Sequence, residues 1–147
     1  MKQVLFACVH NAGRSQMAAA FFDELAHPER ASAVSAGTRP AAQVHPEVVE
    51  VMREVGIELG TVRPRLLTLE LARASHLLVT MGCGEGCPYV PGLERQDWEL
   101  EDPKGKSRED VRAIRDDIRA RVRALLAREG WGRESGAADE QPAGERA

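Results

Sequence analysis

The chain has 147 residues, 43% of them hydrophobic, so it is long enough to bury the core of one domain without disulfide crosslinks. Its formal net charge is −3, and its 20 basic residues are interspersed with 23 acidic ones, which argues against a nucleic-acid partner. We find no signal-peptide pattern and no run of about 18 apolar residues, so we expect a soluble, cytoplasmic protein with no membrane segment.

Strand-like and helix-like segments alternate along the chain. Short apolar runs predict buried strands, and apolar residues at every third or fourth position predict helices. In chain order, we expect a strand at 2–7, a helix at 14–25, a strand at 31–36, a helix at 47–55, a short helix at 68–73, a strand at 76–81, a weaker strand at 95–98 and a long helix after Ser107. This alternation predicts an α/β fold, a three-layer αβα arrangement around a four-stranded parallel sheet whose ligands bind at the carboxyl ends of its strands.

The last predicted helix has one apolar face. Ser107, with Asp110 three residues later, resembles the start of a capping box, and the arginines that follow are interpreted as a solvated face. Beyond this helix small and polar residues dominate, and only Trp131 could pack. We therefore expect a domain over residues 1–129 and a disordered tail over 130–147.

A cysteine and an arginine lie at the two ends of the short loop between the first strand and the first helix. The chain must curl here, so successive N–H groups point into one cavity beside the positive end of the helix dipole, which favours a tetrahedral anion. Arg14 can bind two oxygens of that anion, and Cys8 in the same field should be largely thiolate at neutral pH. Ser15 can steady the thiolate, Gly13 permits close backbone approach, and Asn11 can adopt the left-handed conformation. The expected oxyanion-binding residues are Val9, His10, Asn11, Ala12, Gly13, Arg14 and Ser15.

The other two of the three cysteines follow the predicted strand at 76–81 and should lie at the same sheet edge as Cys8. A reducing compartment disfavours a static disulfide framework, so each thiol needs its own explanation. Cys83 and Cys87 are interleaved with glycines, which allow the backbone to deform and close a small ring. A glycine-rich loop with two incidental thiols is the alternative, and a zinc site would need two further ligands that are not arranged nearby.

Asp102, followed by Pro103, precedes the last helix and could swing toward the anion loop as a proton donor. An Asp-Pro pair alone is a common turn signal. The pair indicates a proton donor only in combination with the other features of the chain.

Together these motifs resemble the thioredoxin-coupled arsenate reductases of the low-molecular-weight tyrosine phosphatase fold. The resemblance spans about residues 2–129 and is carried by Cys8-x5-Arg14-Ser15, the Gln16-Met17-Ala18 continuation, the Cys83 and Cys87 pair and Asp102-Pro103. It implies a low-molecular-weight phosphatase-like fold; we also expect a monomer and no cofactor. The chain departs from the potassium-binding members, because Ala18-Ala19-Ala20 lacks their glutamate, and we therefore expect no metal.

The resemblance also implies one role for each thiol. Cys8 would attack arsenate while Asp102 protonates the departing oxygen, and Cys83 would then release arsenite by forming a Cys8–Cys83 disulfide. Cys87 would convert this to a Cys83–Cys87 disulfide that the flexible loop presents at the surface, where thioredoxin reduces it.

Three alternatives remain open at this point. The Cys83 to Cys87 spacing is shorter than in the best-known thioredoxin-coupled members, which leaves room for a mycothiol-dependent arsenate reductase. A low-molecular-weight tyrosine phosphatase would use Cys8, Arg14 and Asp102, although the residues directly after Pro103, at 104–106, include no aromatic side chain to line a phenyl pocket. An anion-binding redox sensor would need no proton donor.

Overall fold

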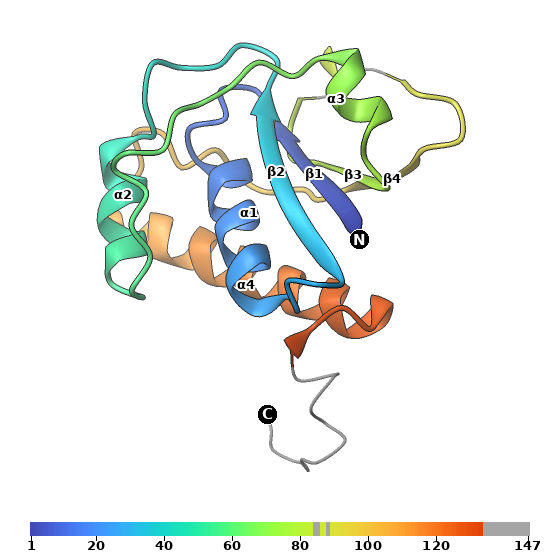
Figure 1. Ribbon diagram of the computed structural model, residues 1–147. Helices are drawn as coiled ribbons and strands as arrows, with labels where there is room; N and C mark the ends of the chain where they lie inside the picture. The colour runs from blue at the N-terminus through green and yellow to red at the C-terminus, as the bar shows by residue number, and fades with distance from the viewer. Residues whose placement is uncertain (84–85, 88, 134–147) are drawn as a thin grey trace.

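The computed structural model describes residues 1–83, 86–87 and 89–133 (Figure 1). Within this part the chain forms four strands and four helices. They are β1 (Lys2–Cys8), α1 (Arg14–Leu25), β2 (Ala31–Gly37), α2 (Pro46–Arg53), α3 (Leu69–Arg73), β3 (Leu77–Thr80), β4 (Glu94–Asp97) and α4 (Arg108–Glu129). All eight predicted elements are present, with ends that differ by a few residues.

The strands form one parallel sheet in the order β2-β1-β3-β4, which confirms the predicted four-stranded parallel sheet. From the central β1 the chain goes to one side to form β2 and then crosses to the other side for β3. The carboxyl end of β1 is therefore the switch point where ligands of such sheets bind. Cys8 is the last residue of β1 and pairs with Gly37 of β2, while Thr80 pairs with Asp97 at the same edge.

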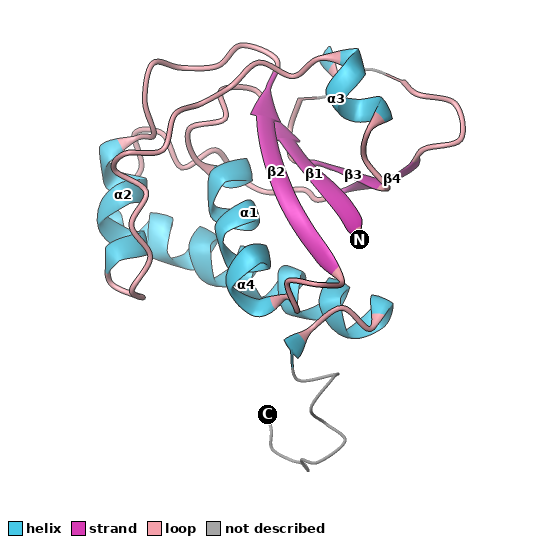
Figure 2. Cartoon of the chain, in the orientation of Figure 1, coloured by secondary structure: helices cyan, strands magenta, loops and turns pink. Residues whose placement is uncertain are grey.

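Helices cover both faces of the sheet (Figure 2), as the three-layer prediction required. Along β1, Val4 and Phe6 pack in the larger cluster with α1, α2 and α4, whereas Leu5 and Ala7 face a smaller cluster that includes Ala72 of α3. All four side chains are fully buried, which is why β1 has a continuous apolar sequence rather than an alternating one.

Helix α4 begins and ends as its sequence predicts. The Ser107 hydroxyl accepts a hydrogen bond from the Asp110 N–H, and Gly130 ends the helix in the left-handed conformation. The interpretation of its arginines as a solvated face is wrong for Arg115, which is 8% exposed. Arg115 faces α2, where its Nη1 donates to the Val51 carbonyl at 2.8 Å.

The described fold continues past residue 129. The Trp131 ring packs edge-on against Phe22 and His76, with ring centroids 6.2 and 5.9 Å apart, and Gly132 forms a β-bridge with Ala26. The remainder of the expected tail, residues 134–147, lies outside the described residues.

Glu54 joins α2 to α4 and makes the stability of this contact depend on pH. Hydrogen bonds from Arg112 above all, and from Arg115, lower the pKa of Glu54 from 4.5 to about 2. The folded state therefore favours the carboxylate, and this stabilisation is complete well above pH 4.5 and is lost as the pH falls toward about 2. We expect Glu54→Gln to have a lower Tm than wild type at neutral pH, with a gap that closes across this range. Thermal unfolding of both proteins measures it, and a gap independent of pH would contradict the assignment.

Candidate active site

The loop after β1 is built so that its backbone N–H groups face a common centre. The carbonyls of residues 8–12 are held on the outside of the loop, where each accepts a hydrogen bond. The donors are Thr38 N–H to the Cys8 carbonyl (3.2 Å), Arg39 N–H to that of Val9 (2.8 Å), Ala41 N–H to that of His10 (2.9 Å), Gln16 Nε2 to that of Asn11 (3.1 Å) and His45 N–H to that of Ala12 (2.9 Å). In a planar trans peptide the next N–H points opposite to the carbonyl, so the N–H groups of residues 9–13 point inward. Among the described residues they have no acceptor, which leaves them available to an anion.

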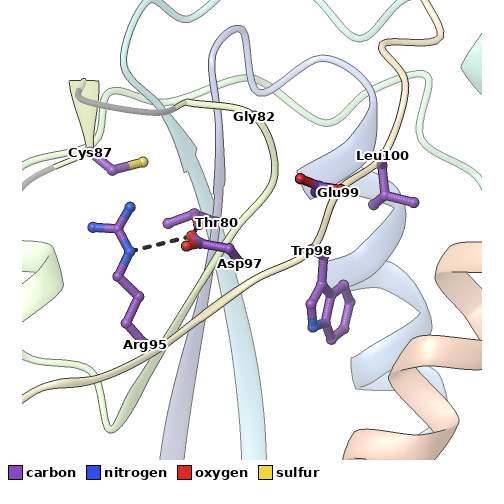
Figure 3. A pocket seen from close by; sticks show the side chains of 8 residues that line it. All are labelled: Thr80, Gly82, Cys87, Arg95, Asp97, Trp98, Glu99 and Leu100. Carbon is purple, nitrogen blue, oxygen red and sulfur yellow. Dashed lines mark hydrogen bonds and ion pairs between the residues drawn. The ribbon is translucent and has the colours of Figure 1, made fainter.

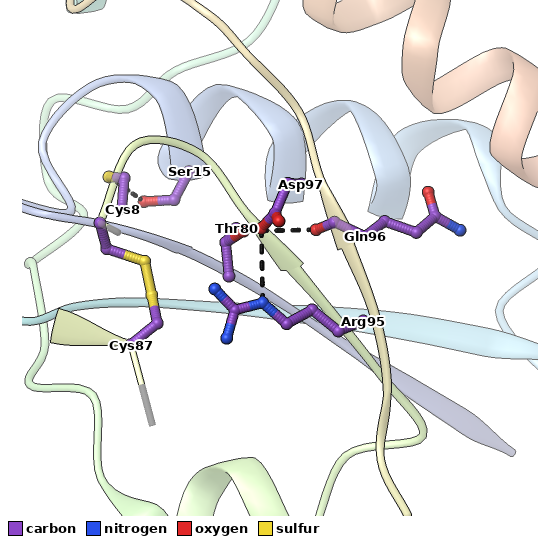
Figure 4. Close-up of a disulfide and its surroundings, with 8 residues drawn as sticks. Cys8, Ser15, Thr80, Cys87, Arg95, Gln96 and Asp97 are labelled. Atoms are coloured by element: carbon purple, nitrogen blue, oxygen red, sulfur yellow. Dashed lines mark hydrogen bonds and ion pairs between the residues drawn. A yellow bond between two sulfur atoms is a disulfide. The ribbon is translucent and has the colours of Figure 1, made fainter. Parts of the chain in front are cut away.

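Cys8 is a free thiol at the floor of this loop, 2% exposed. Its Sγ lies 2.9 Å from the Ser15 hydroxyl (Figure 4). Ser15 Oγ already accepts a hydrogen bond from the Asn11 side-chain amide at 2.7 Å, so its own proton can be donated to Cys8. The structure thus places a hydroxyl donor on the sulfur that the sequence predicts as the nucleophile.

Asn11 is the residue that fixes this chain of hydrogen bonds. It is fully buried and has φ 51°, the left-handed conformation that the sequence suggested. Its Oδ1 accepts from the Arg65 backbone N–H at 2.9 Å and from Gln16 Nε2 at 3.1 Å. Because Arg65 N–H can only donate, the amide nitrogen of Asn11 must face Ser15.

Arg14 occupies the open side of the loop and is 7% exposed. Its Nη1 donates to the Leu100 carbonyl at 3.1 Å, and its Nη2 lies 3.9 Å from Asp102 Oδ2. Asp102 is at the rim, with its side chain 43% exposed, and its Oδ1 accepts from the Lys104 N–H at 3.0 Å. The structure thus brings the predicted proton donor beside the predicted anion clamp.

The segment that carries Asp102 is held against the loop and the start of α2. A Cβ on Gly13 would lie 2.7 Å from Pro103 Cγ, so only glycine leaves room for the Pro103 ring at this position. Glu47 accepts a hydrogen bond from the Gly105 N–H at 3.0 Å. Burial lowers the pKa of the nearby His45 from its ordinary value, against the opposing effects of Glu47 and Asp102.

Cys83 and Cys87 form a disulfide, with Cα atoms 5.7 Å apart, in the segment after β3. This segment adjoins the anion loop at two points. A Cβ on Gly82 would lie 2.5 Å from Arg14 Nη1, and one on Gly86 would lie 3.3 Å from Thr38 Cγ2. The Thr38 N–H in turn bonds to the carbonyl of Cys8, so the three cysteines belong to one site.

The disulfide is less accessible than the sequence suggested. Cys83 and Cys87 are 9% and 6% exposed, because they pack in the smaller apolar cluster with Leu5, Ala7 and Leu78. The expectation that this pair is presented at the surface does not hold in this structure. Cys87 nevertheless forms part of the wall of a cavity of about 650 Å³ between the ends of β3 and β4 (Figure 3).

Gly82→Ala and Gly92→Ala form a matched pair that tests how tightly the disulfide segment packs on Arg14. Both glycines have positive φ, 92° and 84°, so each substitution should cost about 1–2 kcal/mol of stability. A Cβ at residue 92 meets nothing within 4 Å, whereas one at residue 82 displaces the Arg14 guanidinium. We expect Gly82→Ala alone to weaken inorganic phosphate binding about tenfold, equivalent to about 1.4 kcal/mol, by calorimetric titration. Equal phosphate affinities in the two variants would contradict this packing.

The sequence did not identify several residues that complete the site. The backbone N–H of Arg65 and the carbonyl of Leu100 are contributed by peptide groups, which leave no side-chain signal. Gln16 carries part of the family resemblance, but its role in supporting Asn11 rests on hydrogen bonds that only the folded loop creates.

In residues 1–83, 86–87 and 89–133, no three or more His, Cys, Asp or Glu side chains are grouped so that they could hold a metal ion. No helix in the same part of the chain combines the length and apolar character needed to cross a membrane.

Comparison with known proteins agrees with this geometry. Residues 3–134 match the family model of low molecular weight phosphotyrosine protein phosphatases. A putative arsenate reductase of Halobacterium salinarum is 40% identical over 121 residues, which cover 80% of this chain and 85% of the relative. The glutaredoxin arsenate reductase of Synechocystis is 34% identical over 131 residues, covering 87% and 98%.

Solved structures give the same grouping. The thioredoxin-dependent arsenate reductase of Corynebacterium glutamicum superposes with a TM-score of 0.76 at 41% identity, covering 87% of this chain but 61% of that chain. An arsenate reductase solved in its oxidised state superposes with a TM-score of 0.76 at 33% identity, covering 87% and 98%. The chain belongs to the low molecular weight phosphotyrosine protein phosphatase family, among relatives that are named arsenate reductases.

Proposed function

We propose that this protein is an arsenate reductase that uses its three cysteines in succession and thioredoxin as electron donor. The observation that carries the proposal is the Cys83–Cys87 disulfide beside the anion loop of the free Cys8. A hydrolytic phosphatase needs a nucleophile, an anion clamp and a proton donor, but it needs no second and third thiol. The names of the relatives support the same activity.

In the first step, arsenate would bind to the inward N–H groups of the loop and to the Arg14 guanidinium. The thiolate of Cys8, to which the Ser15 hydroxyl can donate a hydrogen bond, attacks arsenic and forms a sulfur–arsenic bond. One arsenate oxygen leaves as water after Asp102 protonates it. Arg14 stabilises the charge that develops on the remaining oxygens, for which its two terminal nitrogens are suited.

In the second step, the electrons would reach arsenic. The Cys83 thiolate attacks Cys8 Sγ, the sulfur–arsenic bond breaks, and its electron pair stays on arsenic, so As(V) becomes As(III) and arsenite leaves. Cys87 then attacks Cys83 Sγ in the Cys8–Cys83 disulfide and releases Cys8 as a thiolate. The structure, with Cys8 free and Cys83 joined to Cys87, corresponds to the end of this cycle.

Re-reduction of Cys83–Cys87 requires a dithiol or two small thiols. The Corynebacterium glutamicum structure is of a thioredoxin-dependent enzyme, whereas the Synechocystis relative is a glutaredoxin enzyme. We propose thioredoxin as the reductant and the cytoplasm as the compartment. We also propose that the enzyme acts as a monomer, because the anion loop and all three thiols come from one chain.

Arsenate-dependent oxidation of NADPH in the presence of thioredoxin and its reductase tests this function. Parallel assays replace thioredoxin by glutaredoxin with glutathione, or by mycothiol with its reductase. We expect turnover with thioredoxin; turnover only with mycothiol would assign the mycothiol-dependent branch. Rapid hydrolysis of a tyrosine-phosphate analogue without arsenate reduction would instead identify a phosphatase.

A further inference from the structure

The cavity at the end of β3 and β4 has polar side chains on one wall and a redox sulfur on the other. Cys87 contributes the sulfur, and Thr80, Arg95 and Asp97 contribute the polar wall (Figure 3). The mechanism above uses Cys87 but none of these three polar side chains. Their arrangement therefore needs a separate explanation.

Arg95 is held by its neighbours on the sheet. Its Nε lies 3.4 Å from Asp97 Oδ1, and the same oxygen accepts a hydrogen bond from the hydroxyl of Thr80, the register partner of Asp97. In Figures 3 and 4 the terminal nitrogens of the Arg95 guanidinium lie on the side of Cys87, whereas its Nε lies on the side of Asp97. The carboxylate thus anchors Arg95 from the side away from the sulfur.

The apolar surroundings of Cys87 disfavour its thiolate, and the Arg95 cation can offset this effect. Thiol–disulfide exchange requires the attacking sulfur to be a thiolate. Cys87 is 6% exposed and packs in the apolar cluster with Leu5, Ala7 and Leu78, an environment that disfavours a charged sulfur. A cation close to the sulfur reverses this preference.

We propose that Arg95 is a positioning residue that holds Cys87 as a thiolate for its attack on Cys83, an inference that rests on the proposed function. In that step the Cys83–Cys87 bond forms, the Cys8–Cys83 bond breaks and Cys8 leaves as a thiolate, with no net change in electrons. Asp97 and Glu99, which also line the cavity, and Arg14 near Gly82 are the other charged groups of the described residues that face this space. Of these, Arg95 is the cation directed at Cys87.

The first test measures the thiolate directly, without arsenate. The fully reduced full-length protein is alkylated with iodoacetamide across a pH series, and each cysteine is quantified by peptide mass spectrometry. In Arg95→Gln we expect the pH midpoint for Cys87 to rise by about one pH unit, which slows its alkylation about tenfold at neutral pH, while Cys8 is unaffected. Arg95→Lys should restore much of the wild-type midpoint.

Arg73, an exposed arginine, offers a charge-matched control for Arg95→Gln. Arg73→Gln removes the same charge from an exposed position in α3, outside the cavity, and should leave the Cys87 midpoint unchanged. A wild-type Cys87 midpoint in Arg95→Gln would overturn the proposal. So would alkylation slowed by the same factor at every pH, since that indicates altered access rather than altered charge.

The second test follows the relay itself in a single turnover. Reduced protein is mixed with arsenate, quenched with acid, and its disulfides are identified by mass spectrometry. In Arg95→Gln the conversion of Cys8–Cys83 to Cys83–Cys87 should be about tenfold slower at neutral pH and recover at alkaline pH. Slowing that does not recover would contradict a role through charge. If neither protein forms Cys8–Cys83, the proposed function fails, and the alkylation result alone decides the role of Arg95.

Discussion

Cys8→Ser is expected to abolish arsenate reduction with every electron donor. A serine hydroxyl is not ionised at neutral pH and forms no disulfide, so neither the arsenic adduct nor the Cys8–Cys83 bond can form. Steady-state NADPH oxidation should fall to the rate without enzyme. Arsenite release in a single turnover, measured by chromatography coupled to arsenic detection, should also be absent.

The same variant distinguishes loss of chemistry from loss of the site. Cys8 is buried at the end of β1, and serine is smaller than cysteine, so the fold and the anion loop should persist. We expect Cys8→Ser to bind inorganic phosphate as wild type does. Arsenate reduction at a measurable fraction of the wild-type rate would show that another thiol is the nucleophile.

Arg14→Lys is expected to lower kcat/KM for arsenate by about 10²–10³-fold, the usual effect of removing one oxyanion donor. Lysine keeps the charge but lacks the planar fork that binds two oxygens. It also cannot span from the Leu100 carbonyl to the anion as the guanidinium does. Steady-state kinetics over a range of arsenate concentrations measure the loss.

Arg73→Lys is the matched control for this prediction, because Arg73 is exposed in α3 and outside the anion loop. It should retain wild-type kcat/KM. If both substitutions had the same small effect, Arg14 would act only as a positive charge, and the two-oxygen clamp would be wrong.

The strands and the start of α4 were predictable because their sequence signals are local. The apolar run in β1 and the cap at Ser107 each depend on residues close in sequence. Arg115 shows what local patterns miss. Helical spacing places it three residues before the buried Ile118 and four after Val111, yet it pairs with Glu54, just after the end of α2, as well as with the adjacent Asp116. The sequence could mark the position as buried, but it could not show how the charge is balanced.

The candidate site also contains features that the local sequence predicts and features that it does not. The strand, loop and helix around Cys8 predict an anion site, and the left-handed Asn11 was foreseeable from residue type. Burial of the Cys83–Cys87 disulfide was not, because the glycines between the cysteines suggest exposure, whereas the apolar cluster around the pair is formed by β1, β2, β3 and α3. The placement of Arg95 toward Cys87 also depends on the pairing of β3 with β4.

The number of arsenite molecules released by Cys87→Ser tests the three-thiol relay most directly. Supplied with arsenate, thioredoxin and its reductase, this variant should release about one arsenite per protein and stop with a Cys8–Cys83 disulfide, detectable by mass spectrometry. Cys83→Ser, the matched control, should release none and keep the adduct on Cys8. Continued turnover of Cys87→Ser at the wild-type rate with thioredoxin would contradict the relay.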